Sequence, residues 1–319
     1  MGQTENVNPL VREVIVSLKS ARPWEDVNLS LILLETTAAC PDQLQTVLSL
    51  LEKNWEPRDS SSWLQVVDLV ITIMERLEVA TMAASAPASV TEKILTNVLC
   101  PAKLVQAVVT PGLSPSQEVV VRSRSSHLLA VILTNINTFL SHLTTTSTTI
   151  TTDLPAGLTK LLTGAVEVWQ LWDLLPSLLE NKQADTVSSI LTITNFWIKM
   201  FGVSPVQGIN IGELLQSVQQ GGLGEEQGVK VQLQILDLMN AMISRSGGEF
   251  SSPGLKEIYS ADTFRLLLQI ITSSQGEQNK SAIETFSGLV KSSGIILQSG
   301  MDLDLLLALG KLANFLPPN

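Results

Sequence analysis

The sequence predicts an all-α protein, an irregular α-α superhelix of the armadillo or HEAT type (an α-solenoid) with about fourteen helices. Apolar residues make up 45% of the 319 residues, and along nearly the whole chain they recur at the spacing of helices that bury one stripe. Short turns rich in Gly, Ser and Pro separate these segments. Several helices are apolar on two sides, which favours stacked helical pairs over a closed bundle, because each unit then buries its stripe against the next.

The first elements in chain order are three helices with clear start signals. Asn8-Pro9 is a cap with proline in the first turn, and it opens a helix to about Lys19. A helix over about 25–39 is apolar nearly all round and has acids at its start, where they suit the helix dipole. Cys40-Pro41 then opens the third helix.

A helix-turn-helix corner is predicted at residues 54–63, which read Asn-Trp-Glu-Pro-Arg-Asp-Ser-Ser-Ser-Trp. Pro57 lacks an N–H and disfavours helical geometry in Glu56, so the helix before it ends here. Asp59 and the serines then accept the free N–H groups that open the next helix. The apolar stripes of the two helices are Leu44, Val47, Leu48, Leu51 and Trp55, then Trp63, Val66, Val67, Val70, Met74 and Leu77.

Beyond the corner, turn and cap signals divide the rest of the chain. A threonine-rich run over 144–152 is predicted to be a linker, because threonine loses rotamer freedom in a helix. We therefore expect a first helical part over 1–143, a linker over 144–153 and continuing helical repeats over 154–319. The expected elements are a loop over 83–89, short helices near 90–98 and 101–110, a capping box at 114–117 that opens the longest helix (about 115–143), and helices near 155–180, 184–201, 210–220, 226–245, 260–273, 279–297 and 302–315.

Composition argues against several classes of partner. The net charge is −10 and neither half of the chain is basic, which disfavours strong direct nucleic-acid binding, since that affinity comes largely from Lys and Arg contacts to phosphates. No uncharged apolar run reaches the ~18 residues of a membrane span, so we expect no membrane partner. Cys40 and Cys100 match neither a metal-ligand spacing nor a disulfide framework, and both are predicted to be buried thiols at helix entrances.

The search for catalytic, cofactor and metal sites finds no candidate. The only histidines, His127 and His142, lie on one predicted helix roughly 22 Å apart, too far to share a metal, and we interpret them as partly buried helix histidines. The glycine-rich run 221–228 misses the G-x-G-x-x-G spacing and follows a helix, so it is an interhelical turn. We therefore predict a protein that is not an enzyme and takes no cofactor, metal or small-molecule substrate.

The candidate partner-binding residues at the corner are Glu56, Arg58 and Trp63. One interpretation is structural: Arg58 pairs with Glu56 or Asp59 and caps the preceding helix, and Trp63 is core. The other is that the corner faces a partner, since an arginine beside indoles is common at interface hot spots.

Two further candidates, Arg122 and Arg124, lie in a stretch without acids, residues 119–152. This stretch is either a positive strip for a partner or an ordinary solvated helix face. Trp169, Trp172 and Trp197 are interpreted as core rather than as a stacking platform.

Three segments near the corner form a recognisable set. They read Pro-Trp-Glu-Asp-Val-Asn-Leu-Ser-Leu-Ile-Leu-Leu at 23–34, Thr-Thr-Ala-Ala-Cys-Pro at 36–41 and Glu-Pro-Arg-Asp-Ser-Ser-Ser-Trp at 56–63. Together they resemble the N-terminal armadillo-like domain of the nucleolar pre-ribosomal-associated protein family (Urb/Npa type). The resemblance covers about residues 23–80 and extends, less closely, over the helical pair at about 95–145.

This resemblance implies a non-enzymatic scaffold in nucleolar large ribosomal subunit biogenesis and pre-rRNA processing. It implies other ribosome assembly factors as partners, and the acidic balance suggests that contact with pre-ribosomal RNA or small nucleolar RNA is indirect. Because the chain is a fraction of that family's length, it is expected to be a fragment or a short relative. The alternative is a cytosolic armadillo-like adaptor that binds a peptide or helix. A third hypothesis, an α-helical hydrolase, would require turnover that depends on His127 or His142.

Overall fold

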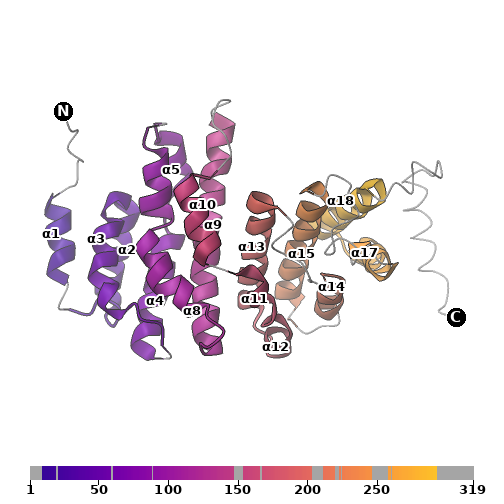
Figure 1. Ribbon diagram of the computed structural model, residues 1–319, viewed down its shortest axis with the longest axis horizontal. Coiled ribbons are helices and arrows are strands. Elements are labelled where there is room, and N and C mark those ends of the chain that lie inside the picture. Colours follow the sequence, from indigo (N-terminus) through magenta and orange to yellow (C-terminus); the bar gives the residue numbers. More distant parts are fainter. Residues whose placement is uncertain are drawn as a thin grey trace. The chain divides into compact units, whose positions relative to one another are not determined.

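The structure is a computed structural model of the chain (Figure 1). It describes residues 9–18, 21–58, 60–87, 89–146, 154–165, 167–202, 211–219, 223, 225–245, 258–259 and 261–292. In these residues all regular elements are helices, and fourteen α-helices have five residues or more. The predicted all-α class and number of helices are confirmed. The chain forms two compact units, Met1–Glu167 and Val168–Asn319.

The first unit begins with α1 (Pro9–Ser17) and α2 (Val27–Ala39). Asp26 is the N-cap of α2, and its Oδ1 accepts hydrogen bonds from the backbone N–H groups of Asn28 (2.8 Å) and Leu29 (3.2 Å). These are two of the donors that a helix start leaves without an intrahelical partner. At the other end, the N–H of Cys40 donates to the Thr36 carbonyl (2.9 Å). The next residue, Pro41, begins a short 3₁₀ helix, so the predicted boundary at Cys40-Pro41 is confirmed.

The next pair, α3 (Leu44–Leu51) and α4 (Ser61–Glu75), brackets the predicted corner. Both helices bury one apolar stripe, as their spacing predicts. The buried side chains are Leu44, Val47, Leu48, Leu50 and Leu51 on α3, and Trp63, Val66, Val67, Leu69, Val70, Ile71, Ile73 and Met74 on α4.

The predicted loop over 83–89 is wrong in its first part. Residues Val79–Ser85 form α5, which ends before Pro87. Alanine is the strongest helix former, so the alanines in this stretch favour helix until proline stops it.

Residues 91–112 form the two short helices that were predicted here. The first is α6 (Thr91–Lys93) with the π-helical segment Ile94–Leu99, and the second is α7 (Ala102–Leu104) with the π-helical segment Val105–Val109 and α8 (Thr110–Gly112). They are separated at Cys100, whose N–H donates to the Leu95 carbonyl (2.9 Å), and at Pro101, which has extended backbone angles.

The stretch Thr91–Gly112 is also the one segment of the described chain that is long and apolar enough to cross a membrane by length and composition. A spanning helix must be continuous, because the bilayer offers no partners for free backbone groups. Here the break at Pro101 interrupts the helix, and many of its side chains are buried inside the protein. We therefore interpret it as a core segment.

The longest helix, α9 (Val119–Thr146), starts and ends later than predicted. Residues 114–117 form a turn in which the Gln117 N–H donates to the Ser114 carbonyl (3.0 Å), not a capping box at a helix start. The helix then runs into the threonine-rich run as far as Thr146, while the rest of the predicted linker, 147–153, lies outside the described residues.

The helix after the threonine-rich run, α10 (Ala156–Ala165), packs on the segment Val105–Val109 and belongs to the first unit. The boundary between the two compact units follows residue 167.

The main helix contacts of the first unit join helices that are not consecutive in the chain. In one row, α2 packs on α4 and α4 packs on α9. In the other, α1 packs on α3 and α3 packs on the segment Ile94–Leu99 (Figure 1). The short helix α5 also lies against α9.

In the second unit, α13 packs on α15, α15 on α18 and α17 on α18, while α14 packs on α15 and on α17. The single helix predicted over 155–180 is wrong, because it is divided into α10, α11 and α12, and Pro176 lies in the first turn of α12. The other predicted helices are confirmed within about five residues, except 302–315, which lies outside the described part of the chain. The helices are α11 (Val168–Trp172), α12 (Leu175–Glu180), α13 (Ala184–Phe201), α14 (Ile211–Gln219), α15 (Glu225–Arg245), α17 (Ala261–Ser273) and α18 (Gly276–Ser292).

Candidate functional site

The corner between α3 and α4 is closed by one cap and two buried indoles. Ser60 has extended backbone angles, and its Oγ accepts a hydrogen bond from the Trp63 N–H (3.3 Å), so it is the N-cap of α4. The ring Nε1–H of Trp63 donates to the backbone carbonyl of Trp55 (3.4 Å) across the turn. Both rings are in the core, at 4% exposed for Trp55 and 1% for Trp63.

The three predicted contact residues of the corner therefore have different positions. The structure corrects the partner-binding interpretation of Trp63, because a ring that is 1% exposed does not reach a partner. Glu56 and Arg58 are exposed. The predicted pairing of Arg58 with Glu56 is not present in the structure, and the pairing with Asp59 falls on a residue outside the described ranges.

Behind the corner, α8 and α9 approach each other closely. A Cβ added at Gly112 would lie 2.0 Å from Ser125 Oγ, 2.9 Å from Ser125 Cβ and 3.7 Å from Pro57 Cγ. Ser125 is fully buried, and its hydroxyl has no hydrogen-bond partner among the described residues. The absence of a side chain at Gly112 is thus what lets α9 pack beneath the corner.

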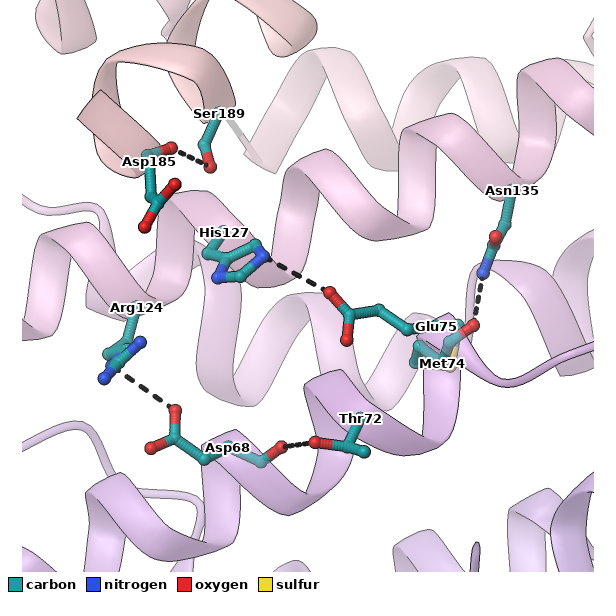
Figure 2. Close-up of polar contacts among 9 residues, drawn as sticks. All are labelled: Asp68, Thr72, Met74, Glu75, Arg124, His127, Asn135, Asp185 and Ser189. Atoms are coloured by element: carbon teal, nitrogen blue, oxygen red, sulfur yellow. Dashed lines mark hydrogen bonds and ion pairs between the residues drawn. The ribbon is translucent and has the colours of Figure 1, made fainter. Parts of the chain in front are cut away.

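The prediction of a positive strip on α9 is corrected, because acidic side chains of the neighbouring helix α4 face this strip. Arg122 is only 8% exposed and so adds little to a surface. Arg124 Nε lies 3.3 Å from Asp68 Oδ1, and both side chains are about half exposed. His127 Nε2 lies 3.5 Å from Glu75 Oε1 on the same side of the pairing (Figure 2). A stretch without acids in sequence is therefore faced by two acids in space.

The buried side of the same helix pairing carries one polar contact. The Nδ2 of Asn135 donates to the backbone carbonyl of Met74 at 2.8 Å (Figure 2). That carbonyl lies in the last turn of α4, where helix carbonyls lack intrahelical donors. Sequence reasoning missed this contact, although a signal existed: an asparagine within the apolar stripe of a long helix requires a partner once it is buried.

The predicted core tryptophan of the second unit is confirmed at Trp197, which is 3% exposed. Trp172 donates its Nε1–H to Thr194 Oγ1 (3.0 Å), an interhelical contact between α11 and α13. The side chain of Trp169 is not among those described. The histidine interpretation is confirmed for His127, which is about one-third exposed, and is wrong for His142, which is exposed.

The cysteines differ in burial. Cys100 is fully buried, and this burial raises the pKa of its thiol to about 12. The thiol is therefore neutral at ordinary pH and unsuited to act as a nucleophile. Cys40 is partly exposed, so the prediction of two buried thiols holds only for Cys100. Burial also raises the pKa of Asp237 on α15, against a lowering by Lys199.

Surface cavities occur in both units. One of about 470 Å³ lies between the segments over 94–110 and α10, with Cys100, Ala102, Leu158 and Leu161 in its lining. Two others, of about 290 and 420 Å³, lie in the second unit and share Gln219 and Gln269. No group of three or more His, Cys, Asp or Glu side chains that could hold a metal ion is found in the residues that the structure describes.

The candidate site is a part of the surface of the first unit. Around the corner, Glu56 and Arg58 are exposed to solvent just before the capped start of α4, and the ion pairs of α4 and α9 lie on the same unit. Comparison with protein-family models, with curated proteins and with solved structures found no match to this chain.

Proposed function

We propose that this chain is a non-enzymatic α-solenoid scaffold in nucleolar assembly of the large ribosomal subunit and in pre-rRNA processing. One observation carries the proposal: the residues behind the resemblance to the nucleolar pre-ribosomal-associated family have clear structural roles in this fold. Asp26 and Ser60 cap helices, Cys40 ends one, and Trp63 fills the corner. Caps, helix ends and buried rings are positions at which a fold constrains the residue type. Their presence together in this sequence therefore favours the same kind of helical pair as in that family.

The surface side of the corner supplies the contact that a scaffold needs. Glu56 and Arg58 flank Pro57 and are exposed on a turn whose two ends are fixed by buried indoles. A surface residue whose neighbours are packed in the core has less backbone freedom to lose on binding than one in a long flexible loop. The partners in this proposal are other ribosome assembly factors, and pre-ribosomal or small nucleolar RNA is contacted through them, since the net charge is −10.

Depletion of the protein in its native cell tests the proposal. The expected result is a loss of large-subunit precursors relative to small-subunit precursors, measured by pre-rRNA blotting, with the tagged protein enriched in the nucleolus. Unchanged pre-rRNA processing would contradict it.

A matched pair of variants tests the corner. Arg58→Glu is expected to lower the recovery of assembly factors with the tagged protein at unchanged thermal stability, because the side chain is exposed. Lys53→Glu is the control, since it makes the same charge change at another exposed position five residues earlier. Equal recovery with both variants would remove Arg58 from the contact.

A second candidate function is a cytosolic adaptor that binds an extended peptide. It is favoured by the adjoining cavities of the second unit, which are lined by the amide side chains of Gln216, Gln219, Gln232, Gln269 and Gln278. Amides offer both donors and acceptors, as a peptide backbone requires. A diffuse cytoplasmic signal without nucleolar enrichment would favour this candidate over the first.

A further inference from the structure

The second unit has a polar groove where α14, α15, α17 and α18 pack together (Figure 1). The groove consists of two cavities, of about 290 and 420 Å³, and both have Gln219 of α14 and Gln269 of α17 in their linings. The two cavities therefore adjoin. We call the smaller one the Gln232 cavity and the larger one the Arg265 cavity, after one lining residue of each.

The lining of the Gln232 cavity contains a polar side chain that is nearly buried. Gln232 of α15 is only 7% exposed, and it lines the cavity together with the buried apolar residues Val218, Leu223 and Ile270. A buried amide is costly unless its donors and acceptors are paired. The hydrogen bonds of Gln232 therefore indicate what the cavity can hold.

The amide of Gln232 is only partly paired. Its Oε1 accepts a hydrogen bond from the Nε2 of Gln278 on α18. Its own Nε2 has no hydrogen-bond partner among the described residues and is not closed off from solvent, so it faces the cavity that the side chain lines. The Oε1 of Gln278 likewise accepts no hydrogen bond from the described part of the chain. The pair thus offers donors at Gln232 and an acceptor at Gln278 to a ligand.

The rest of the lining adds neutral hydrogen-bonding groups. The hydroxyls of Ser273 and Ser274 donate to the backbone carbonyls of Gln269 (2.7 Å) and Ile270 (2.6 Å), so their oxygens remain free to accept. The amides of Gln219 and Gln269 offer both donors and acceptors. Among the described residues, no charged side chain lines this cavity.

This lining favours an uncharged group that both donates and accepts hydrogen bonds. A charged side chain would lose its hydration without meeting an opposite charge. An apolar side chain would leave the donors of Gln232 without an acceptor. A carboxamide has an acceptor oxygen and two N–H donors, so it can pair with both Gln232 and Gln278. A hydroxyl has one donor, and the short side chains that carry it fill less of the cavity.

The adjoining Arg265 cavity provides room for the chain on which such a group is carried. Its lining consists of amides, charges of both signs and one apolar side chain: Gln216, Gln219, Asp262, Arg265, Leu266 and Gln269. We propose that an extended peptide lies in the groove and that the Gln232 cavity takes one of its asparagine or glutamine side chains. This inference rests on the peptide-binding function given above as the second candidate, and adds which residue of the peptide is recognised.

The test offers pools of blocked heptapeptides to the immobilised full chain. The central residue of each pool is glutamine, asparagine, glutamate, leucine or serine, and the other positions are randomised without asparagine or glutamine. Retained peptide is measured by mass spectrometry. The glutamine or the asparagine pool is expected to be retained about tenfold more than the glutamate, leucine and serine pools, because only a carboxamide pairs with both sides of the cavity.

Matched variants locate the binding. Gln232→Glu keeps the shape of the side chain and an acceptor for Gln278 but removes the amide donors, so the preference for carboxamide pools is expected to be lost. Gln227→Glu makes the same change at an exposed position of α15 outside both linings, and is expected to keep the preference.

A third variant narrows the cavity without changing its hydrogen bonds. A Cβ added at Gly228, which lines the Gln232 cavity, lies 3.7 Å from the Leu223 carbonyl oxygen, an ordinary contact. Gly228→Met is therefore expected to fold and to lower the retention of every pool, whereas Gly157→Met on α10 of the first unit is the control and should have no effect. Circular dichroism and urea unfolding check that the variants fold, and Gly228→Met decides the location if Gln232→Glu does not.

The outcomes separate this inference from the function on which it rests. If no pool is retained, the groove binds no peptide, and the second candidate function fails together with the inference. If peptides are retained without preference for a carboxamide, or the preference survives Gln232→Glu, only the inference is wrong. Retention that is unchanged in Gly228→Met would place the peptide outside the groove and would also overturn it.

Discussion

The two sides of the pairing between α4 and α9 are held together by different chemistry. On the exposed side, Arg124 faces Asp68 and His127 faces Glu75. On the buried side, Asn135 donates to the Met74 carbonyl (Figure 2). Trp63 lies in the core at the start of α4, and Ser125 of α9 is pressed against Gly112.

The difference decides where stability resides. Exposed ion pairs are worth about 0–1 kcal/mol, because water and salt screen them and two long side chains must be ordered. A buried polar group that loses its partner costs about 1–3 kcal/mol, and a buried ring more. We therefore expect the buried side to determine the fold, and the exposed side to be available for change or for partners.

The largest effect is expected for Trp63→Ala. Removing a fully buried indole takes away apolar contact and leaves a cavity, so unfolding free energy should fall by about 3–5 kcal/mol in urea titrations. Val27→Ala is the control, since Val27 is 83% exposed, and should change stability by no more than about 0.5 kcal/mol. A loss below about 1 kcal/mol at Trp63 would mean that the ring is not core.

A second test concerns the close approach behind the corner. Gly112→Ala places a methyl group 2.0 Å from Ser125 Oγ and 2.9 Å from its Cβ, which should cost about 1–3 kcal/mol through overpacking. Gly157→Ala on α10 is the matched control: nothing lies within 4 Å of its added Cβ, so the better helix propensity of alanine should stabilise by up to about 1 kcal/mol.

The double variant Gly112→Ala/Ser125→Gly separates the clash from other causes. The double variant removes the Ser125 atoms that the new methyl group meets. Its loss of unfolding free energy should therefore be smaller than the sum of the losses in the two single variants. Strict additivity would show that the approach of Gly112 to Ser125 is not the source of the loss.

The third test removes the buried hydrogen bond. Asn135→Leu keeps the branching at Cγ but leaves the Met74 carbonyl without its donor, so stability should fall by about 1–3 kcal/mol. Asn137→Leu makes the same substitution at an exposed position of the same helix and should be close to neutral. Equal losses of stability at both positions would show that the loss at Asn135 does not come from its buried hydrogen bond.

The smallest effect is expected on the exposed side. A double-mutant cycle of Arg124→Ala and Asp68→Ala should give a coupling free energy below about 1 kcal/mol, and 1 M NaCl should reduce it further. A coupling free energy as large as the loss of stability in Asn135→Leu would contradict the expected difference between the exposed and the buried side of the pairing.

Sequence reasoning predicted elements better than it predicted surfaces. The end of one helix at Cys40, the start of another at Ser60 and the bounds of α13 follow from caps, prolines and apolar spacing, and the structure confirms them. These rules failed where neighbouring residues favour different structures. The stretch over 79–85 carries three alanines, which favour helix, and ends at Ser85, which is typical of a loop; it forms a helix.

The candidate site was harder to predict, because its residues meet over long sequence separations. The stretch with Arg122 and Arg124 has no acid of its own, yet in space Arg124 faces an acid from α4. Trp63 stood beside charged residues in sequence, yet its ring is buried, whereas Glu56 and Arg58 are exposed.

By itself, the sequence determined that this protein is helical and where most helices begin and end. It could do so because caps and apolar periods act within three or four residues, at the scale of one helical turn. Only the tertiary structure decided which faces are covered. Asn135 donates to the Met74 carbonyl, Arg124 pairs with Asp68, and Val27 and Leu31 remain exposed. Periodicity gives each helix an apolar face, but the neighbour that covers it depends on how helices far apart in sequence pack together.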